Sequence, residues 1–151
     1  MKVLQPSLEK KGQEPKYLGK VVIGTIEGDI HDIGKNIVAS LLRAEGFRVV
    51  DLGKDVLLEK FVDIAQRENA DIIGVSALLT TTMQKQRDLI SMLRDRGIHD
   101  KISVMIGGAP SSEGWAKEIG ADGYAPDAAE AARLARRLVA SSKRTAGNIV
   151  R

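Results

Sequence analysis

One short segment carries most of the candidate chemistry of this sequence. It reads EGDIHDIG over residues 27–34 and follows a run of strand-forming residues. Asp29 stands two residues before His31, close enough to accept a hydrogen bond from one ring nitrogen. Such a bond fixes the tautomer of the imidazole and leaves its other nitrogen free to bind a metal. Gly28 and Gly34 carry no side chains, so a bulky planar ligand could approach the backbone on either side.

The number of histidines limits the kind of metal site. The chain has 2 histidines, and His99 is predicted at the surface, at the opposite end of the sheet from His31. A bare zinc ion needs three or four protein ligands. A single ligand is sufficient when the metal arrives already chelated, as in a tetrapyrrole, so the residues alone indicate haem or a corrin. The alternative is that His31 is a structural or surface residue.

Four hydroxyl side chains gather in a second segment, near the end of another predicted strand. They belong to Ser76, Thr80, Thr81 and Thr82. Thr81 or Thr82 could simply cap the helix that follows, which leaves Ser76 and Thr80 available to bond a polar group at the sheet edge. Thr82 could also extend the pair of His31 and its carboxylate into a relay that reaches solvent.

The apolar pattern predicts the elements that position these segments. Short β-branched runs alternate with amphipathic stretches, as in a chain of βα units. Strands are predicted at residues 20–26, 47–52, 71–76, 101–106 and 123–124. Helices are predicted at residues 33–45, 56–68, 82–96, 111–119 and 127–141. The sequence therefore predicts an α/β fold with a doubly wound, five-stranded parallel sheet, flavodoxin-like or Rossmann-like, in the order 2-1-3-4-5.

The same pattern predicts which side of each early helix is buried. The first helix is expected to bury Ile33, Ile37, Leu41 and Leu42. The second is expected to begin after an N-cap at Asp55 and to bury Val56, Phe61, Ile64 and Ala65. Both faces would pack against the sheet.

The strand order predicts where a ligand would bind. In such sheets ligands lie beyond the carboxyl ends of the strands, where the winding direction reverses. Here that point lies between the first and third strands, so the segments 27–34 and 76–82 should meet there. Gly107 and Gly108 follow the fourth strand and would allow close backbone approach, although turns also use such pairs. Topology and residue chemistry thus indicate the same edge of the sheet.

Composition narrows the class of protein. The 151 residues are enough for one domain with a proper core and too few for two comfortable ones. Aromatic residues make up only 3%, so the core must consist of Val, Ile, Leu and Ala, which suits a parallel sheet covered on both faces. The absence of cysteine excludes disulfides, thiolate–zinc sites and iron–sulfur ligation by this chain.

Membranes and nucleic acids are not expected as partners. Residues 1–20 lack the apolar core of an export signal, and no run approaches the length of a membrane span. The formal charge of +3 is mild, and the basic residues near the end occur without a nucleic-acid-reading motif. We therefore expect a cytoplasmic protein that binds neither.

Other common ligand sites of this topology do not match. No GxGxxG follows the first strand, and no GKS or GKT occurs. A phospho-receiver would need an aspartate at the end of the third strand, where this chain has Ser76. A nucleophile with its base and orienting group is not apparent either.

Three motifs together carry a resemblance to a known family. They are DxHxxG at residues 29–34, SxL at residues 76–78 with Thr80, and GG at residues 107–108, in that order. Over residues 18–140 the chain resembles the cobalamin-binding domain of corrinoid methyl-carrier proteins, which serve methanol, methylamine and methoxy-aryl methyltransferases. It is also similar to the cobalamin module of methionine synthase.

The resemblance implies roles for individual residues. His31 would bind cobalt in place of the cofactor's own benzimidazole, which is the base-off/His-on state of a cobalamin or related corrinoid. Asp29 would bond that histidine and Thr82 would complete the relay, and these two are expected to tune reactivity rather than to hold the cofactor. The expected cofactor-binding residues are Gly28, Asp29, His31, Asp32, Ile33, Gly34, Ser76, Leu78, Thr80, Thr82, Gly107, Gly108, Tyr124 and Ala125.

The resemblance also implies partners and a domain division. The chain would carry a methyl group on cobalt between a substrate-specific methyltransferase and an acceptor methyltransferase of the coenzyme M or tetrahydrofolate type, with a reductive activator. It would have no self-contained active site. Residues 1–19 look like the remnant of a helical cap or a linker, residues 20–142 like the cobalamin-binding domain, and residues 143–151 like a basic tail.

Three alternatives remain open at this point. An adenosylcobalamin mutase domain shares the fold and the histidine but usually lacks this run of threonines. A cobalamin-dependent sensor or transcription regulator would need a DNA-binding partner domain. A flavodoxin-like domain without any cofactor is the third.

Overall fold

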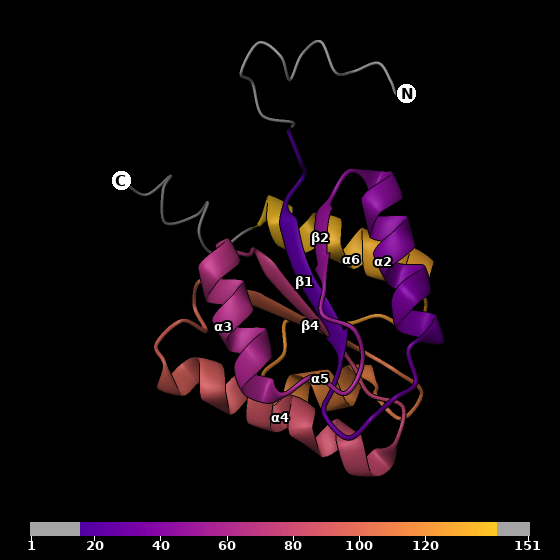
Figure 1. Ribbon diagram of the computed structural model, residues 1–151, viewed down its shortest axis with the longest axis vertical. Helices are drawn as coiled ribbons and strands as arrows, with labels where there is room; N and C mark the ends of the chain where they lie inside the picture. Colours follow the sequence, from indigo (N-terminus) through magenta and orange to yellow (C-terminus); the bar gives the residue numbers. More distant parts are fainter. Residues whose placement is uncertain (1–15, 142–151) are drawn as a thin grey trace.

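Five strands form one parallel sheet at the centre of the computed structural model, which describes residues 16–141. The strands are β1 (Lys20–Thr25), β2 (Arg48–Asp51), β3 (Ile72–Ser76), β4 (Ser103–Gly107) and β5 (Gly123–Tyr124). Their order is β2-β1-β3-β4-β5, and every pairing is parallel (Figure 1). The predicted fold class and strand order are confirmed. The predicted basic tail and residues 1–15 of the predicted N-terminal segment lie outside the described residues.

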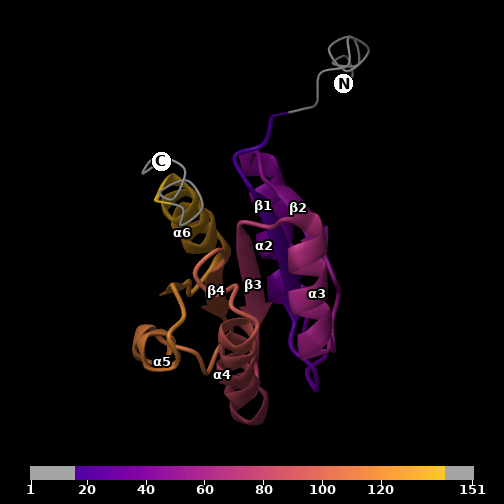
Figure 2. The same cartoon turned by 90° about the vertical axis from the view of Figure 1, so that its left-hand side faces the viewer.

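Helices cover both faces of the sheet. They are α2 (Ile33–Glu45), α3 (Leu58–Glu68), α4 (Thr80–Asp95), α5 (Glu113–Ile119) and α6 (Ala128–Ala140). The first and last of these pack on one face, and α3, α4 and α5 pack on the other. Figure 2 shows α3 beside β1 and β2, and α6 on the side of β4. Within residues 16–141, no helix is long and apolar enough to cross a membrane.

The core has two parts, one on each face of the sheet, built from alternate residues of the strands. Successive strand side chains point to opposite faces of a sheet. On β1, Val22 therefore packs with α3 and α4, whereas Val21 and Ile23 pack with α2 and α6. All three are buried, as the near-continuous apolar runs of a covered parallel sheet require.

The buried face of α2 differs from the prediction. Ile33 and Ile37 are 78% and 56% exposed, while Lys35, Ala39 and Leu42 are buried. Only the C-terminal half of the helix packs on the sheet, where Leu42 and Ala39 contact the strand residues. The N-terminal half lies along the strand ends, where Ile33 is exposed at the edge of a cavity and Ile37 is exposed to solvent. The helix period was right, but the choice of face at its start was wrong.

The start of α3 also differs. Asp55 has a left-handed backbone (φ 52°) and is not an N-cap, because Val56 first forms an isolated bridge with Ile26 and the helix begins only at Leu58. The first free amide, Leu58 N–H, is instead bonded by Glu27 Oε1 at 3.0 Å. A carboxylate from the neighbouring loop thus replaces the expected local cap. The ends of the other elements lie within two residues of the predicted ones.

Candidate functional site

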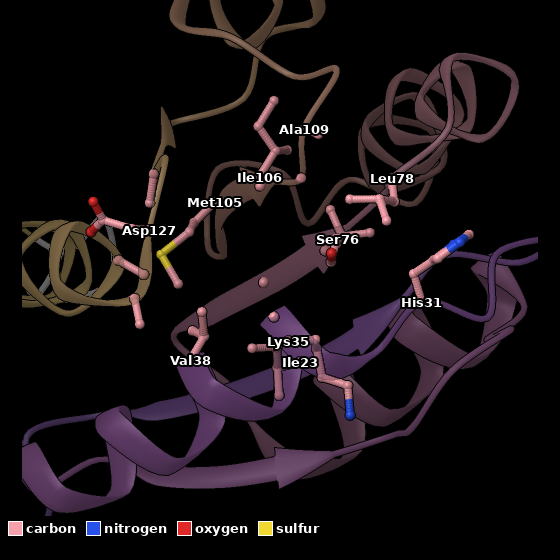
Figure 3. Close-up of a pocket in the computed structure, with 18 of the residues that line it drawn as sticks. Ile23, His31, Lys35, Val38, Ser76, Leu78, Met105, Ile106, Ala109 and Asp127 are labelled. Atoms are coloured by element: carbon pink, nitrogen blue, oxygen red, sulfur yellow. The ribbon is translucent and has the colours of Figure 1, made fainter.

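A cavity of about 590 Å³ opens at the carboxyl ends of the strands. It lies between the α2–α6 side of the sheet and those two helices, since Ile23 of β1, Met105 of β4, Val38 of α2 and Ala131 of α6 all line it. Figure 3 shows His31 and Asp127 at opposite ends, with Ser76 between them. This is the predicted switch point between β1 and β3. The volume lies in the range of cofactor and small-molecule sites.

Most of the predicted site residues form the wall of this cavity. Those that line it are His31, Asp32, Ile33, Gly34, Ser76, Leu78, Gly107, Gly108, Tyr124 and Ala125. The remaining four, Gly28, Asp29, Thr80 and Thr82, are not among the lining residues. Asp29 and Thr82 are buried directly behind His31, whereas Thr80 is the exposed first residue of α4. Gly28 adopts φ 86° and donates its N–H to Asp55 Oδ1 at 2.8 Å.

Asp29 joins the two loops of the switch point. Its side chain is 0% exposed and accepts four hydrogen bonds. Oδ1 accepts from His31 N (3.1 Å) and is 2.6 Å from His31 Nδ1. Oδ2 accepts from Leu78 N (2.8 Å) and from Thr82 Oγ1 (2.7 Å). A single carboxylate therefore fastens the segment after β1 to the segment after β3.

The charge of Asp29 follows from these bonds. Burial alone would raise the pKa of this carboxyl. The bonds from the Thr82 hydroxyl, the Leu78 amide and the ring and amide of His31 outweigh that effect and hold the pKa of Asp29 well below its usual range. Asp29 is therefore ionised at neutral pH and can only accept hydrogen bonds.

An ionised Asp29 determines the tautomer of His31. Because the carboxylate has no proton to donate, Nδ1 must carry the hydrogen of the 2.6 Å bond. In the neutral ring the lone pair then lies on Nε2. The side chain of His31 is 47% exposed and lines the cavity, and its backbone carbonyl accepts from the buried Thr25 hydroxyl at 3.2 Å. The site thus presents one fixed imidazole nitrogen that can bind a metal.

Thr82 forms the inner end of the same network. Its hydroxyl donates to Asp29 and accepts from the backbone N–H of Leu79 at 3.3 Å. The residue is only 5% exposed, and its other partner is the backbone of Leu79, so Thr82 does not extend the network to solvent as predicted. The structure brings Thr82, Asp29 and His31 together in that order. It does not bring Thr80 to them.

The glycine pair at the end of β4 lets the backbone there approach the segment that follows β3. Gly108 has φ 112°, and a Cβ built on it would collide with the carbonyl of Ala77. At Gly107 a Cβ would lie 3.4 Å from the carbonyl of Ala125. Gly34 differs, since a Cβ there would meet nothing within 4 Å. At residues 107–108 the missing side chains make room for the protein's own backbone, whereas at Gly34 the missing side chain leaves open space.

Sequence reasoning missed part of the cavity wall. Lys35 is 3% exposed, and its Nζ donates to Asp51 Oδ1 and Oδ2 at 2.8 and 3.0 Å. Figure 3 shows its ammonium pointing away from the cavity, so the alkyl stem is the part that lines the wall. Gly74, inside β3, was a readable signal, because an interior strand glycine often marks close approach of a ligand or backbone. The start of α6 gave no such signal.

Apolar side chains surround His31 at the mouth of the cavity. Ile30 is 65% exposed, and Leu78 and Leu79 are about 40% exposed, in addition to the isoleucines of α2. Of these residues, Ile30, Ile33 and Leu78 line the cavity, and exposed apolar side chains at a cavity are typical of a ligand or partner site. A large, largely apolar ligand would therefore find complementary surface around a single nitrogen.

The metal-binding groups at the cavity fit a chelated metal better than a bare ion. In residues 16–141, no three His, Cys, Asp or Glu side chains gather as they would around a bare ion. One oriented imidazole nitrogen, an apolar rim and a deep cavity fit a metal that brings its own equatorial ligands and a long substituent. The donor set and the shape of the site thus fit a corrinoid.

Known proteins match the chain over most of its length. The B12 binding domain family matches residues 19–133. Dimethylamine corrinoid protein 2 of Methanosarcina acetivorans is 52% identical over 128 residues, which cover 85% of this chain and 59% of that protein. The monomethylamine corrinoid protein of Methanosarcina barkeri has a TM-score of 0.78 at 44% identity, covering 91% of this chain and 65% of that one.

A third match comes from a complex. The methanol:cobalamin methyltransferase complex of Methanosarcina barkeri contains a chain with a TM-score of 0.80 at 40% identity, covering 88% of this chain and 51% of that one. The chain spans between half and two-thirds of the length of these three relatives. The family match covers the whole sheet and every wall of the cavity. The chain therefore belongs to the B12 binding domain family.

Proposed function

We propose that residues 20–142 bind a cobalamin or related corrinoid in the base-off/His-on state and carry a methyl group on its cobalt. The observation that carries this proposal is the imidazole of His31. Its Nδ1 is bonded to the buried Asp29 at 2.6 Å, and its Nε2 is left for a metal at the mouth of the cavity. The names of the relatives, corrinoid proteins for methylamines and a methanol:cobalamin methyltransferase, support the same function.

His31 would bind the cobalt, and Asp29 and Thr82 would adjust the properties of that histidine. When bound, the corrinoid supplies a cobalt centre that can accept and release a methyl group. Asp29 holds the proton of His31 on Nδ1, and Thr82 orients the carboxylate. If Nε2 takes up a proton, the ionised Asp29 stabilises the resulting imidazolium. Asp29 and Thr82 therefore tune the ligand, and His31 provides it.

The deep part of the cavity would receive the nucleotide tail of the corrinoid. Ser76 offers a hydroxyl at the wall, and Gly107, Gly108 and Ala125 keep that wall free of bulky side chains, whereas the side chain of Tyr124 packs on the opposite face of the sheet. This assignment is supported by the extent of the cavity beyond His31, since Figure 3 shows Ser76 between His31 and Asp127. Thr80, which is exposed at the start of α4, would contact the cofactor only outside the cavity.

The proposed partners are separate proteins. A substrate-specific methyltransferase would load the methyl group, and an acceptor methyltransferase of the coenzyme M or tetrahydrofolate type would remove it, with a reductive activator to restore the cobalt. The complex of a relative with a methanol methyltransferase supports the first of these. The chain would act in the cytoplasm as a carrier without an active site of its own.

The proposal is tested by reconstituting the protein with methylcobalamin and recording its visible spectrum. We expect a stable coloured complex with a histidine-ligated spectrum for the wild type. His31→Ala should shift the spectrum to the base-off form, because the cobalt loses its protein ligand. His99→Ala, which changes the other histidine at the far end of the sheet, is the matched control and should leave the spectrum unchanged. A wild type that retains no colour after desalting would overturn the corrinoid proposal.

The division between holding and tuning has its own test. Asp29→Asn should still retain methylcobalamin, with a spectrum that shows weaker histidine ligation. Loss of all binding in that variant, with its fold intact by circular dichroism, would show that Asp29 holds the cofactor.

A further inference from the structure

A fully buried glutamine sits behind the cavity, on the opposite side of the sheet. Gln86 of α4 is 0% exposed and uses all the hydrogen-bonding capacity of its amide. Nε2 donates to the carbonyls of Val75 (3.1 Å) and Gly107 (3.3 Å). Oε1 accepts from Ser111 Oγ (3.2 Å) and Trp115 Nε1 (3.0 Å). Two donors and two acceptors fix the orientation of this amide.

The two carbonyls bonded by Gln86 belong to the cavity wall. Val75 and Gly107 are near or at the ends of β3 and β4, and both line the cavity. Gly107 O also accepts from Ala77 N at 3.1 Å, so it joins the ends of the two strands. The next residue, Gly108, lies against Ala77 so closely that no Cβ would fit. A small movement of Gly107 would therefore change the width of the cavity at this point.

Gln86 is also connected to the elements beyond the sheet. Ser111 lies in the segment between β4 and α5, and Trp115 lies in α5. Both side chains are largely buried. Their bonds to one amide connect α4, α5 and two strand ends at a single point, on the side of the sheet away from the proposed cofactor.

We infer that Gln86 is a positioning residue for the tail-binding part of the cavity, acting through the carbonyls of Val75 and Gly107. This inference rests on the proposed function, since the tail is that of the proposed corrinoid. Gln86 holds the ends of β3 and β4 at the spacing that admits the nucleotide tail. It has no role in ligating the metal, because His31 is held by the separate network of Asp29.

The test compares a corrinoid that has the nucleotide tail with one that lacks it. Aquocobalamin and aquocobinamide are titrated into the full chain, and the Kd of each is measured from the visible spectrum. The wild type should bind aquocobalamin more tightly. Gln86→Met keeps the side-chain volume but removes both donors and both acceptors. We expect it to raise the Kd of aquocobalamin by about tenfold, because buried polar partners are left unsatisfied at the wall.

The same variant should leave the Kd of aquocobinamide within about twofold of the wild type, since that ligand does not enter the deep cavity. Gln84→Met is the matched control, because Gln84 is exposed on the same helix. Both of its Kd values should equal those of the wild type. Ser111→Ala removes one of the four partners of the amide, together with the 3.4 Å contact of Ser111 Oγ to Gly107 O, and should show the same selective loss, to a smaller extent.

The outcomes distinguish the role of Gln86 from the proposal that the chain binds a corrinoid. An equal rise of both Kd values in Gln86→Met would mean that Gln86 supports the fold in general, and would overturn the inference. Equal binding of the two corrinoids by the wild type would also overturn it, with His31 still a ligand. Binding of neither by the wild type would instead refute the proposed function. If Gln86→Met fails to fold, the ratio of the two Kd values in Ser111→Ala decides.

Discussion

Asp29 and Gln86 do similar structural work by different means. Both are 0% exposed, and each uses four hydrogen bonds to hold loop or strand ends at the cavity. Asp29 is a charged carboxylate that only accepts, whereas Gln86 is a neutral amide that donates twice and accepts twice. The hydrogen bonds that Asp29 makes beside His31 therefore depend on its protonation state, whereas those that Gln86 makes behind the cavity do not.

This difference matches what each part of the site must do. The carboxylate side fixes the proton of His31 on Nδ1, because an ionised Asp29 can only accept a hydrogen bond. The amide side shapes a wall, which benefits from a geometry that does not change with pH. Substitutions at Gly108, Asp29, Gln86 and Thr82 test this comparison.

The largest effect is expected at Gly108, next to the Gly107 carbonyl that Gln86 bonds, because the backbone of Ala77 leaves no space for a side chain there. Gly108→Ala places a methyl group against the carbonyl of Ala77 at φ 112°. We expect a loss of about 3 kcal/mol or more in the free energy of unfolding, from steric overlap added to left-handed strain. Gly53→Ala is the control, because Gly53 has φ 94° but open space around it. It should lose only about 1 kcal/mol in urea unfolding.

Equal losses at Gly108 and Gly53 would show that backbone strain alone matters at residue 108. The close contact between Gly108 and the carbonyl of Ala77 would then not be what requires glycine at this position.

The second largest effect distinguishes the charged Asp29 from the neutral Gln86 by its dependence on pH. Because the folded pKa of Asp29 is depressed, its stabilisation is fully present above the unfolded pKa of about 4 and is lost as the pH falls below that value. Asp29→Asn should cost about 2 kcal/mol at pH 7. The deficit relative to wild type should shrink as the pH is lowered from 5 toward 2, as urea unfolding at each pH would show. A constant deficit over that range would contradict an ionised Asp29.

The Gln86→Met variant sharpens this test, since its deficit should not depend on pH in the same range. A pH-dependent deficit there would remove the distinction between the two buried side chains.

The smallest effect concerns the hydroxyl behind the carboxylate. Thr82→Val removes the 2.7 Å bond to Asp29 and should cost about 1 kcal/mol. It should also raise the pKa of Asp29, so the acid unfolding midpoint moves to higher pH. Thr82→Ser keeps the hydroxyl and should retain the wild-type midpoint. If the Val and Ser variants behave alike, the hydroxyl does not support the carboxylate.

The sheet and the central part of the site were predictable from sequence because they depend on local signals. β-branched runs of strand length set the strands, and the alternation with helical periods predicted their order. Asp29 and His31 are two residues apart, so their contact needed no knowledge of the tertiary structure. Thr82 is more remote, but the strand order alone brought its loop to theirs.

The remaining parts depend on tertiary contacts that no short segment records. The start of α2 exposes Ile33 and Ile37 and buries Lys35, because Lys35 finds Asp51 at the end of β2. A period of 3.6 residues locates an apolar stripe but does not say what lies opposite it. Gln86 was likewise invisible, since its four partners lie on three other elements and in one loop. The sequence pattern was least informative for Lys35 and Gln86, buried polar residues outside any motif.

The segment that carries His31 is not an independent unit, which matters for protein engineering. Glu27 completes the first turn of α3 at Leu58, and Asp55 N–H donates to the carbonyl of Asp29 at 2.9 Å. Grafting residues 27–34 alone onto another flavodoxin-like scaffold should therefore yield a histidine loop without its anchors. A transplantable cassette would comprise that segment together with residues 55–58 and 78–82.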